Sequence, residues 1–108
     1  MQSLIVKELC RELAGENPAV MVTVLRTHGS TPRKAGSQML VRENGEIVGT
    51  IGGGLAEHQA MRLALSAFRT RLSTVHQVTM NASVAESDGM ACGGEMEFFI
   101  QYIPPGNR

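Results

Sequence analysis

The sequence has no tryptophan, only two cysteines and no net charge, and each of these absences excludes a class of protein. Ten Lys and Arg balance ten Asp and Glu, so the chain lacks the cationic excess typical of nucleic-acid-binding proteins. No apolar run approaches the roughly 18 residues of a membrane-spanning helix, and charged residues interrupt the start of the chain where a signal peptide would be apolar. Two cysteines make no disulfide framework. The composition therefore predicts a cytoplasmic globular domain that binds neither nucleic acid nor membranes.

The length and the hydrophobic pattern predict one small domain of the α/β class, in its α+β form, over residues 1–108. Only four residues are aromatic, so the core must consist mainly of Val, Leu, Ile and Met. We expect a mixed β-sheet of about five strands and two main helices. The expected strands are residues 19–27, 38–42, 46–51, 74–80 and 95–103, and the expected helices are residues 3–13 and about 55–71.

Local patterns add detail to three of these elements. Residues 19–27 are nearly all apolar or β-branched, which predicts a strand covered on both faces. Asn44-Gly45 predicts a tight type I′ turn between two strands. The second helix has an apolar stripe that we expect to face the core, made of Leu55, Met61, Ala64, Leu65, Phe68 and Leu72. The small size and an exposed sheet edge also make a homodimer a reasonable expectation.

The glycine-rich segment Gly49-Thr50-Ile51-Gly52-Gly53-Gly54 lies between a predicted strand and a predicted helix. Its backbone N–H groups and the positive end of the helix could bind an anion, or the segment could be a tight strand-to-helix turn. It fits neither the Walker A loop nor the G-x-G-x-x-G fingerprint. Glu57 lies near the third position of the helix, where its carboxylate could accept the N–H of the capping residue.

Two further loops contain residues capable of chemistry. Arg33, with Ser30 nearby, lies in an aperiodic glycine-containing loop, and a guanidinium there suits a phosphate or carboxylate or is simply solvated. Cys92 precedes Gly93 and Gly94, where a thiol could act as a nucleophile, a persulfide carrier, a soft metal ligand or a structural residue. The histidines and Cys92 lack the spacing of a zinc site.

Four motifs follow one another in an order that resembles the XdhC/CoxI family, whose members are accessory and maturation proteins of xanthine dehydrogenase and carbon monoxide dehydrogenase. The resemblance extends from about residue 20 to residue 102. The motifs are Gly29-Ser30-Thr31-Pro32-Arg33, Gly36 with Met39, the segment from Gly49 to Gly54 with Glu57, and Gly89-Met90-Ala91-Cys92-Gly93-Gly94.

The resemblance implies a molybdenum-cofactor chaperone that is not itself an enzyme. Such a protein binds molybdopterin, in its simple or dinucleotide form, while the terminal sulfur ligand is installed, and delivers it to an apo molybdenum hydroxylase. A cysteine desulfurase or a separate Rossmann-domain protein would be a further partner. The implied roles are as follows: Gly52, Gly53, Gly54 and Arg33 hold the phosphate or the dinucleotide tail, Cys92 beside Gly93 ligates molybdenum or engages the transferred sulfur, and Ser30 and Glu57 meet the pterin.

The chain departs from the family pattern at two points. Leu55 stands where family members commonly have a cysteine, and the chain ends at Arg108, so we expect no Rossmann-like C-terminal domain. Two other functions remain open. One is a sulfurtransferase that depends on Cys92, and the other is a partner module of a larger maturation protein that binds no cofactor.

Overall fold

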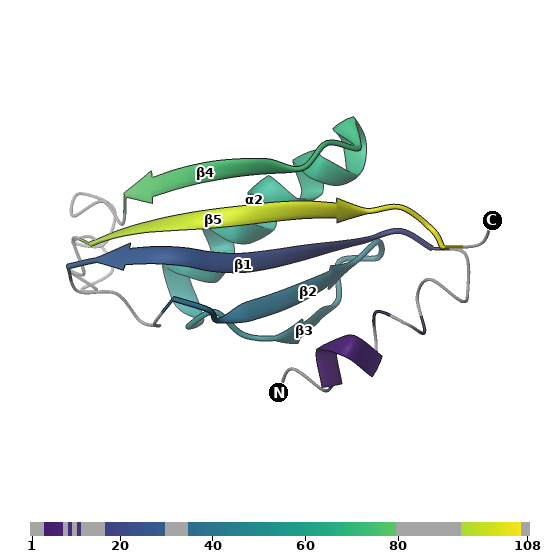
Figure 1. Ribbon diagram of the computed structural model, residues 1–108, viewed down its shortest axis with the longest axis horizontal. Coiled ribbons are helices and arrows are strands. Elements are labelled where there is room, and N and C mark those ends of the chain that lie inside the picture. The colour runs from purple at the N-terminus through teal and green to yellow at the C-terminus, as the bar shows by residue number, and fades with distance from the viewer. Residues whose placement is uncertain are drawn as a thin grey trace.

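The computed structural model describes residues 4–7, 9, 11, 17–29, 35–79 and 94–106. Its elements follow one another as strand β1 (Ala19–His28), β2 (Gln38–Arg42), β3 (Ile47–Gly49), helix α2 (Gly54–Thr70), β4 (Thr74–Thr79) and β5 (Glu95–Ile103). Residues 4–7, 9 and 11 are also helical. Figure 1 shows the five strands side by side, with α2 behind them. The predicted α+β class is confirmed.

The sheet has the strand order β3-β2-β1-β5-β4, and every pairing within it is antiparallel. The expected mixed sheet is therefore corrected to a purely antiparallel one. Helix α2 starts after β3 at one edge of the sheet and leads to β4 at the other edge, so the crossover joins two strands that are not neighbours. β5 lies between β4 and β1 and is antiparallel to both, so the sheet contains no parallel pair of neighbouring strands.

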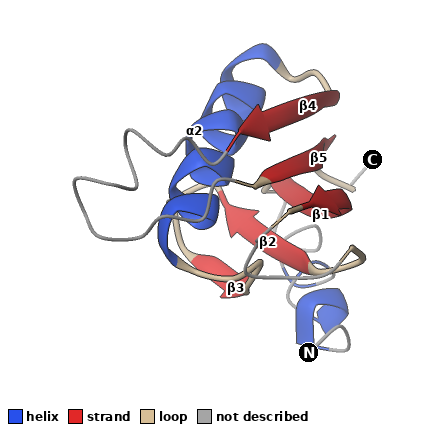
Figure 2. Ribbon diagram, turned by 90° about the vertical axis from the view of Figure 1, so that its left-hand side faces the viewer, coloured by secondary structure: helices blue, strands red, loops and turns tan. Residues whose placement is uncertain are grey.

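Helix α2 lies on one face of the sheet (Figure 2) and packs on β1 and β5. Its buried residues are Ala56, Ala60, Ala64 and Ala67. The predicted stripe is confirmed at Ala64, which is buried, and at Leu55, Met61 and Phe68, which are partly buried against the core. It is wrong at Leu65 and Leu72, which are 47% and 61% exposed. Small side chains let the helix approach the sheet closely, and the large side chains that fill the layer come from the strands, such as Phe98 and Ile100.

The opposite face of the sheet, which we call the outer face, is covered only in part by the described residues. Ile5 from the N-terminal helical residues packs there with Ala19, Met21 and Leu40. Leu25, further along β1, is 40% exposed beside a register shift between Val24 and Arg26. The prediction that this strand is covered on both faces is thus confirmed for its first half and wrong for its second.

The β2–β3 hairpin has a three-residue loop in place of the predicted type I′ turn. Gly45 has a φ of 94°, whereas Asn44 does not have a positive φ. The Gly45 N–H donates to the Arg42 carbonyl at 2.8 Å, and the Glu46 N–H donates to Asn44 Oδ1 at 2.9 Å. One left-handed glycine therefore suffices to close this hairpin.

Candidate functional site

Glycines from all four sequence motifs lie near strand ends on one side of the sheet, which we call the loop end and define by Gly29, Gly36, Gly49 and Gly94. β1 leaves the sheet at this end and β5 enters it, with His28 opposite Glu95. A Cβ built on Gly29 would lie 3.3 Å from the Gly94 Cα atom. β3 ends on the same side of the sheet at Gly49, opposite Met39. Because Met39 pairs with Val22, Gly49 lies level with a residue six positions before His28 in β1. Figure 1 shows this end of the sheet at the left.

The predicted site residues divide into two groups. Gly52, Gly53, Gly54 and Glu57 lie within the described residues, next to the loop end. The other four predicted site residues fall outside the described ranges: Ser30, Arg33, Cys92 and Gly93. Their predicted roles therefore stay predictions, although the residues that flank them, Gly29 and Gly94, lie close together.

The turn between β3 and α2 requires glycine. Gly52, Gly53 and Gly54 have φ values of 121°, 71° and 55°, which side-chain-bearing residues rarely adopt. At Gly49, with a φ of 88°, a Cβ would lie 2.9 Å from the Gln38 carbonyl oxygen. A Cβ at Gly53 would meet no atom within 4 Å, so the space beside this residue is open.

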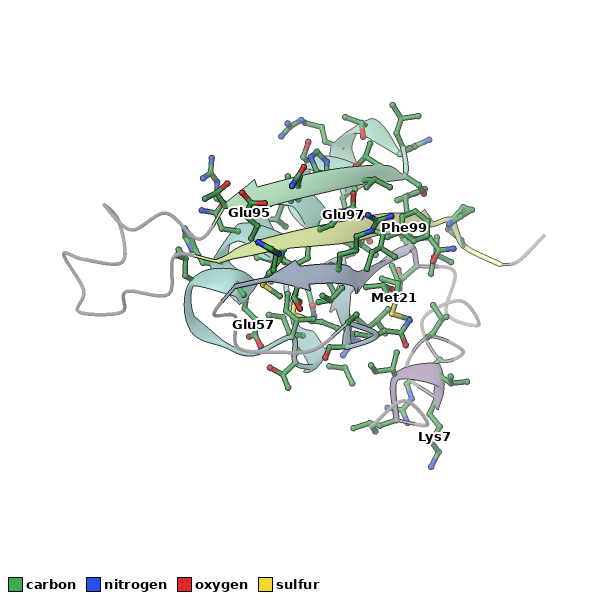
Figure 3. All side chains as sticks on the ribbon, turned by 60° about the vertical axis from the view of Figure 1, so that its left-hand side comes forward. Lys7, Met21, Glu57, Glu95, Glu97 and Phe99 are labelled. Atoms are coloured by element: carbon green, nitrogen blue, oxygen red, sulfur yellow. The ribbon has the colours of Figure 1, made fainter. Side chains whose placement is uncertain are left out.

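Glu57 binds this turn from the first turn of α2 (Figure 3). Its Oε2 atom accepts the Gly53 N–H at 2.9 Å and the Ile51 N–H at 3.3 Å. The same atom accepts the Thr50 hydroxyl, whose Oγ1 in turn accepts the Gly52 N–H at 3.0 Å. The prediction that Glu57 accepts the N–H of the capping residue, Gly53, is confirmed.

These contacts limit how the turn can bind an anion. Two of its N–H donors, from Ile51 and Gly53, already serve a carboxylate of the same chain. The next N–H groups, of Gly54, Leu55 and Ala56, belong to the first turn of the helix and have no partner within an α-helix. They are the donors that remain for an external anion, together with the positive end of the helix dipole.

A trough of about 430 Å³ opens on the outer face near the loop end. Its polar side chains include Gln77, whose Nε2 donates to Glu95 Oε1 at 3.1 Å, and Arg26, whose Nε lies 3.4 Å from Glu97 Oε1. No sequence motif marks these residues. The alternation of β5 places Glu95 and Glu97 on the same face, but only the strand order brings Gln77 and Arg26 beside them. The trough is lined by Arg26, Thr27, His28, Gln77, Glu95, Met96 and Glu97.

The described residues contain no cluster of three or more His, Cys, Asp or Glu side chains that could hold a metal ion. Cys92, the predicted metal ligand, falls outside those ranges, so its predicted role stays a prediction. Within the described part of the chain there is also no helix with the length and apolar character needed to cross a membrane.

Comparison with known proteins shows that the chain is similar to proteins of several bacteria. Over 83 residues the chain is 41% identical to the uncharacterized protein YqeB of Escherichia coli K12, and this match covers 77% of this chain and 15% of that protein. It is 33% identical over 82 residues to a probable xanthine dehydrogenase subunit of Bacillus subtilis, with 75% and 24% covered. A solved structure of a Bacillus halodurans protein, described as a xanthine dehydrogenase, matches with a TM-score of 0.69 and 30% identity, over 88% of this chain and 29% of the other.

The chain thus spans less than a third of the length of each of these relatives. The model of the XdhC and CoxI family matches residues 13–79, more than half of the chain. This range contains the first three motifs, including the glycine turn and Glu57, and stops before the fourth motif around Cys92. The chain therefore belongs to the XdhC and CoxI family.

Proposed function

We propose that this chain is an accessory domain for the maturation of a molybdenum hydroxylase, and that it binds the molybdenum cofactor at the loop end of the sheet. The observation that carries the proposal is that glycines of the family's motifs mark strand ends on this side of the sheet. Gly29 and Gly94 come from segments far apart in the sequence, yet they lie next to each other where β1 ends and β5 begins, and Gly49 ends β3 on the same side. Loops held together by a rigid sheet are a common location for binding sites.

The described residues fit the anionic part of a pterin cofactor through their backbone. The open side of Gly53 and the first-turn N–H groups from Gly54 to Ala56 suit the close approach of a phosphate. Glu57 would act as a positioning residue here, because its carboxylate holds the turn in its left-handed conformation. We assign Arg33 to the phosphate and Ser30 to the polar edge of the pterin.

The cofactor, when bound, would supply a molybdenum centre with a terminal sulfur ligand. Cys92, next to Gly93, would hold the metal or shield the sulfur, since thiolates suit soft ligation. The role that we propose for the chain is to bind and deliver this group to an apo hydroxylase, with sulfur supplied by a partner such as a cysteine desulfurase. The related proteins described as xanthine dehydrogenases support the choice of partner enzyme.

The test is cofactor retention by the intact chain. The protein would be expressed in cells that make molybdopterin and purified without oxygen, and the molybdenum and the fluorescent oxidised pterin per chain would be measured. We expect pterin in the wild type and a loss of most of it in Arg33→Ala and Cys92→Ser. Arg69→Ala is the matched control for Arg33, because Arg69 is an exposed cation in the last turn of α2.

Two outcomes would contradict the proposal. One is a wild-type protein with no more pterin than an unrelated protein purified in parallel. The other is equal loss in Arg33→Ala and Arg69→Ala, which would show an effect of charge anywhere on the surface. If Cys92→Ser kept its pterin, the metal-holding role of Cys92 would be refuted while the phosphate assignment stood.

A further inference from the structure

β4 is one of the two edge strands of the sheet, and in the described part of the chain it has none of the features that usually protect an edge. Among the described strands, β5 pairs with one side of β4 and none pairs with the other. The six residues of the strand, TVHQVT, include no Lys, Arg, Asp, Glu or Pro, and its pairing with β5 has no register shift. Alternate residues of such a strand point their N–H and C=O groups away from the sheet. An edge of this kind is a template for another strand.

The opposite edge is different. β3 has only three residues, Ile47–Gly49, and the last of them is a glycine with positive φ. Glu46, which precedes β3, carries a charge and forms an ion pair with Arg42. Shortness and flanking charge are devices by which natural sheets avoid edge-to-edge pairing. The two edges are therefore not equivalent, and only β4 is suited to extend the sheet.

Two exposed apolar side chains lie in and after the second half of α2. Leu65 of α2 and Leu72, in the connection between α2 and β4, are 47% and 61% exposed. Phe68, between them, makes an edge-to-face contact with Tyr102 of β5 at 6.4 Å between ring centroids. The Tyr102 N–H donates to Ser73 Oγ, directly before β4, and this bond joins the α2–β4 connection to β5. α2 itself packs on β1 and β5.

We propose that this chain forms a homodimer in which β4 pairs antiparallel with β4 of a second copy, about a twofold axis at His76 or Gln77. Such a register places Val75, Gln77 and Thr79 of both copies on one face and both α2 helices on the other. The choice of a second copy rests on charge, because a twofold axis brings identical side chains together and this strand has no charge to repel its copy.

The first measurement is the molar mass of the purified chain by sedimentation or light scattering, without cofactor. We expect twice the 11.6 kDa of one chain. Gln77→Lys should raise the dissociation constant at least about tenfold, since like charges meet across the axis. Within one copy the new ammonium group would lie beside Glu95, the present partner of Gln77, so the monomer should stay folded. Circular dichroism checks that it does.

Ile47→Lys is the matched control, because Ile47 is 38% exposed on the opposite edge strand. It should leave the dimer unchanged. A wild-type chain that stays monomeric at the highest soluble concentration would overturn the proposal. So would a dimer that is weakened by Ile47→Lys and not by Gln77→Lys. Neither result depends on whether the chain retains cofactor. The proposed homodimer and the proposed cofactor binding can therefore be refuted independently of each other.

Discussion

Removing the Glu57 carboxylate should destabilise the domain far more than removing an exposed one. Oε2 of Glu57 accepts two backbone N–H groups and the Thr50 hydroxyl, and Ile51, which provides one of the N–H groups, is buried. A buried donor left without an acceptor costs about 1–3 kcal/mol. Gly53 is half-buried and water can replace part of its bond. We therefore expect Glu57→Ala to lower the free energy of unfolding by about 2–3 kcal/mol.

Thermal denaturation at neutral pH would measure this effect. For a domain of about 100 residues, a loss of about 2–3 kcal/mol corresponds to a fall in Tm of roughly 10–20 °C. Glu46→Ala is the matched control, because Glu46 forms an ion pair with Arg42 and its side chain is 61% exposed. Such a pair contributes about 0–1 kcal/mol. Equal Tm values for Glu57→Ala and Glu46→Ala would refute the view that Glu57 holds the glycine turn together.

Three other substitutions test the packing around the site. Gly49→Ala should lower stability by about 1–3 kcal/mol in urea denaturation, because its Cβ would lie 2.9 Å from a carbonyl oxygen at a φ of 88°; a wild-type midpoint would contradict this. Ala64→Leu should cost about 1–3 kcal/mol in the same assay, since Ala64 is fully buried between α2 and the sheet; no change would mean that the layer has spare room. Arg26→Ala should change the Tm little, because the Arg26 side chain is 84% exposed and its pair with Glu97 is at the surface; a large fall would show that the pair supports the bulge in β1.

The strands are predictable from the sequence where local alternation is clear. The predicted strands at residues 38–42 and 95–103 have the same bounds as β2 and β5. In β5, Met96, Phe98 and Ile100 are buried, in agreement with the alternation. Each of these predictions depends only on a side chain's own strand, because the period of two sets the face to which it points.

The sheet order and the trough are not predictable in this way. β5 pairs with β1 although more than 60 residues separate them in the sequence, and no local pattern encodes that pairing. The predicted helix stripe is wrong at Leu65 and Leu72 for another reason. Hydrophobicity ranks leucine above alanine, whereas close packing of a helix on a sheet selects small side chains, so Ala60 and Ala64 are buried while Leu65 is exposed.

The charges at the loop end indicate which substitution gives the sharpest test of the proposed cofactor binding. Glu57 already occupies two donors of the glycine turn, and Glu95 and Glu97 lie on the outer face at the same end, opposed among the trough residues by Arg26. Carboxylates there repel an anionic cofactor tail, so the first-turn N–H groups of α2 need a cation beside them to hold a phosphate. Under the proposed function, Arg33 of the first motif would supply that cation. Retention that is insensitive to Arg33→Ala would therefore place the phosphate elsewhere. Wild-type retention that falls at high ionic strength, with a smaller fall in Arg33→Ala, would support binding of the phosphate by this guanidinium.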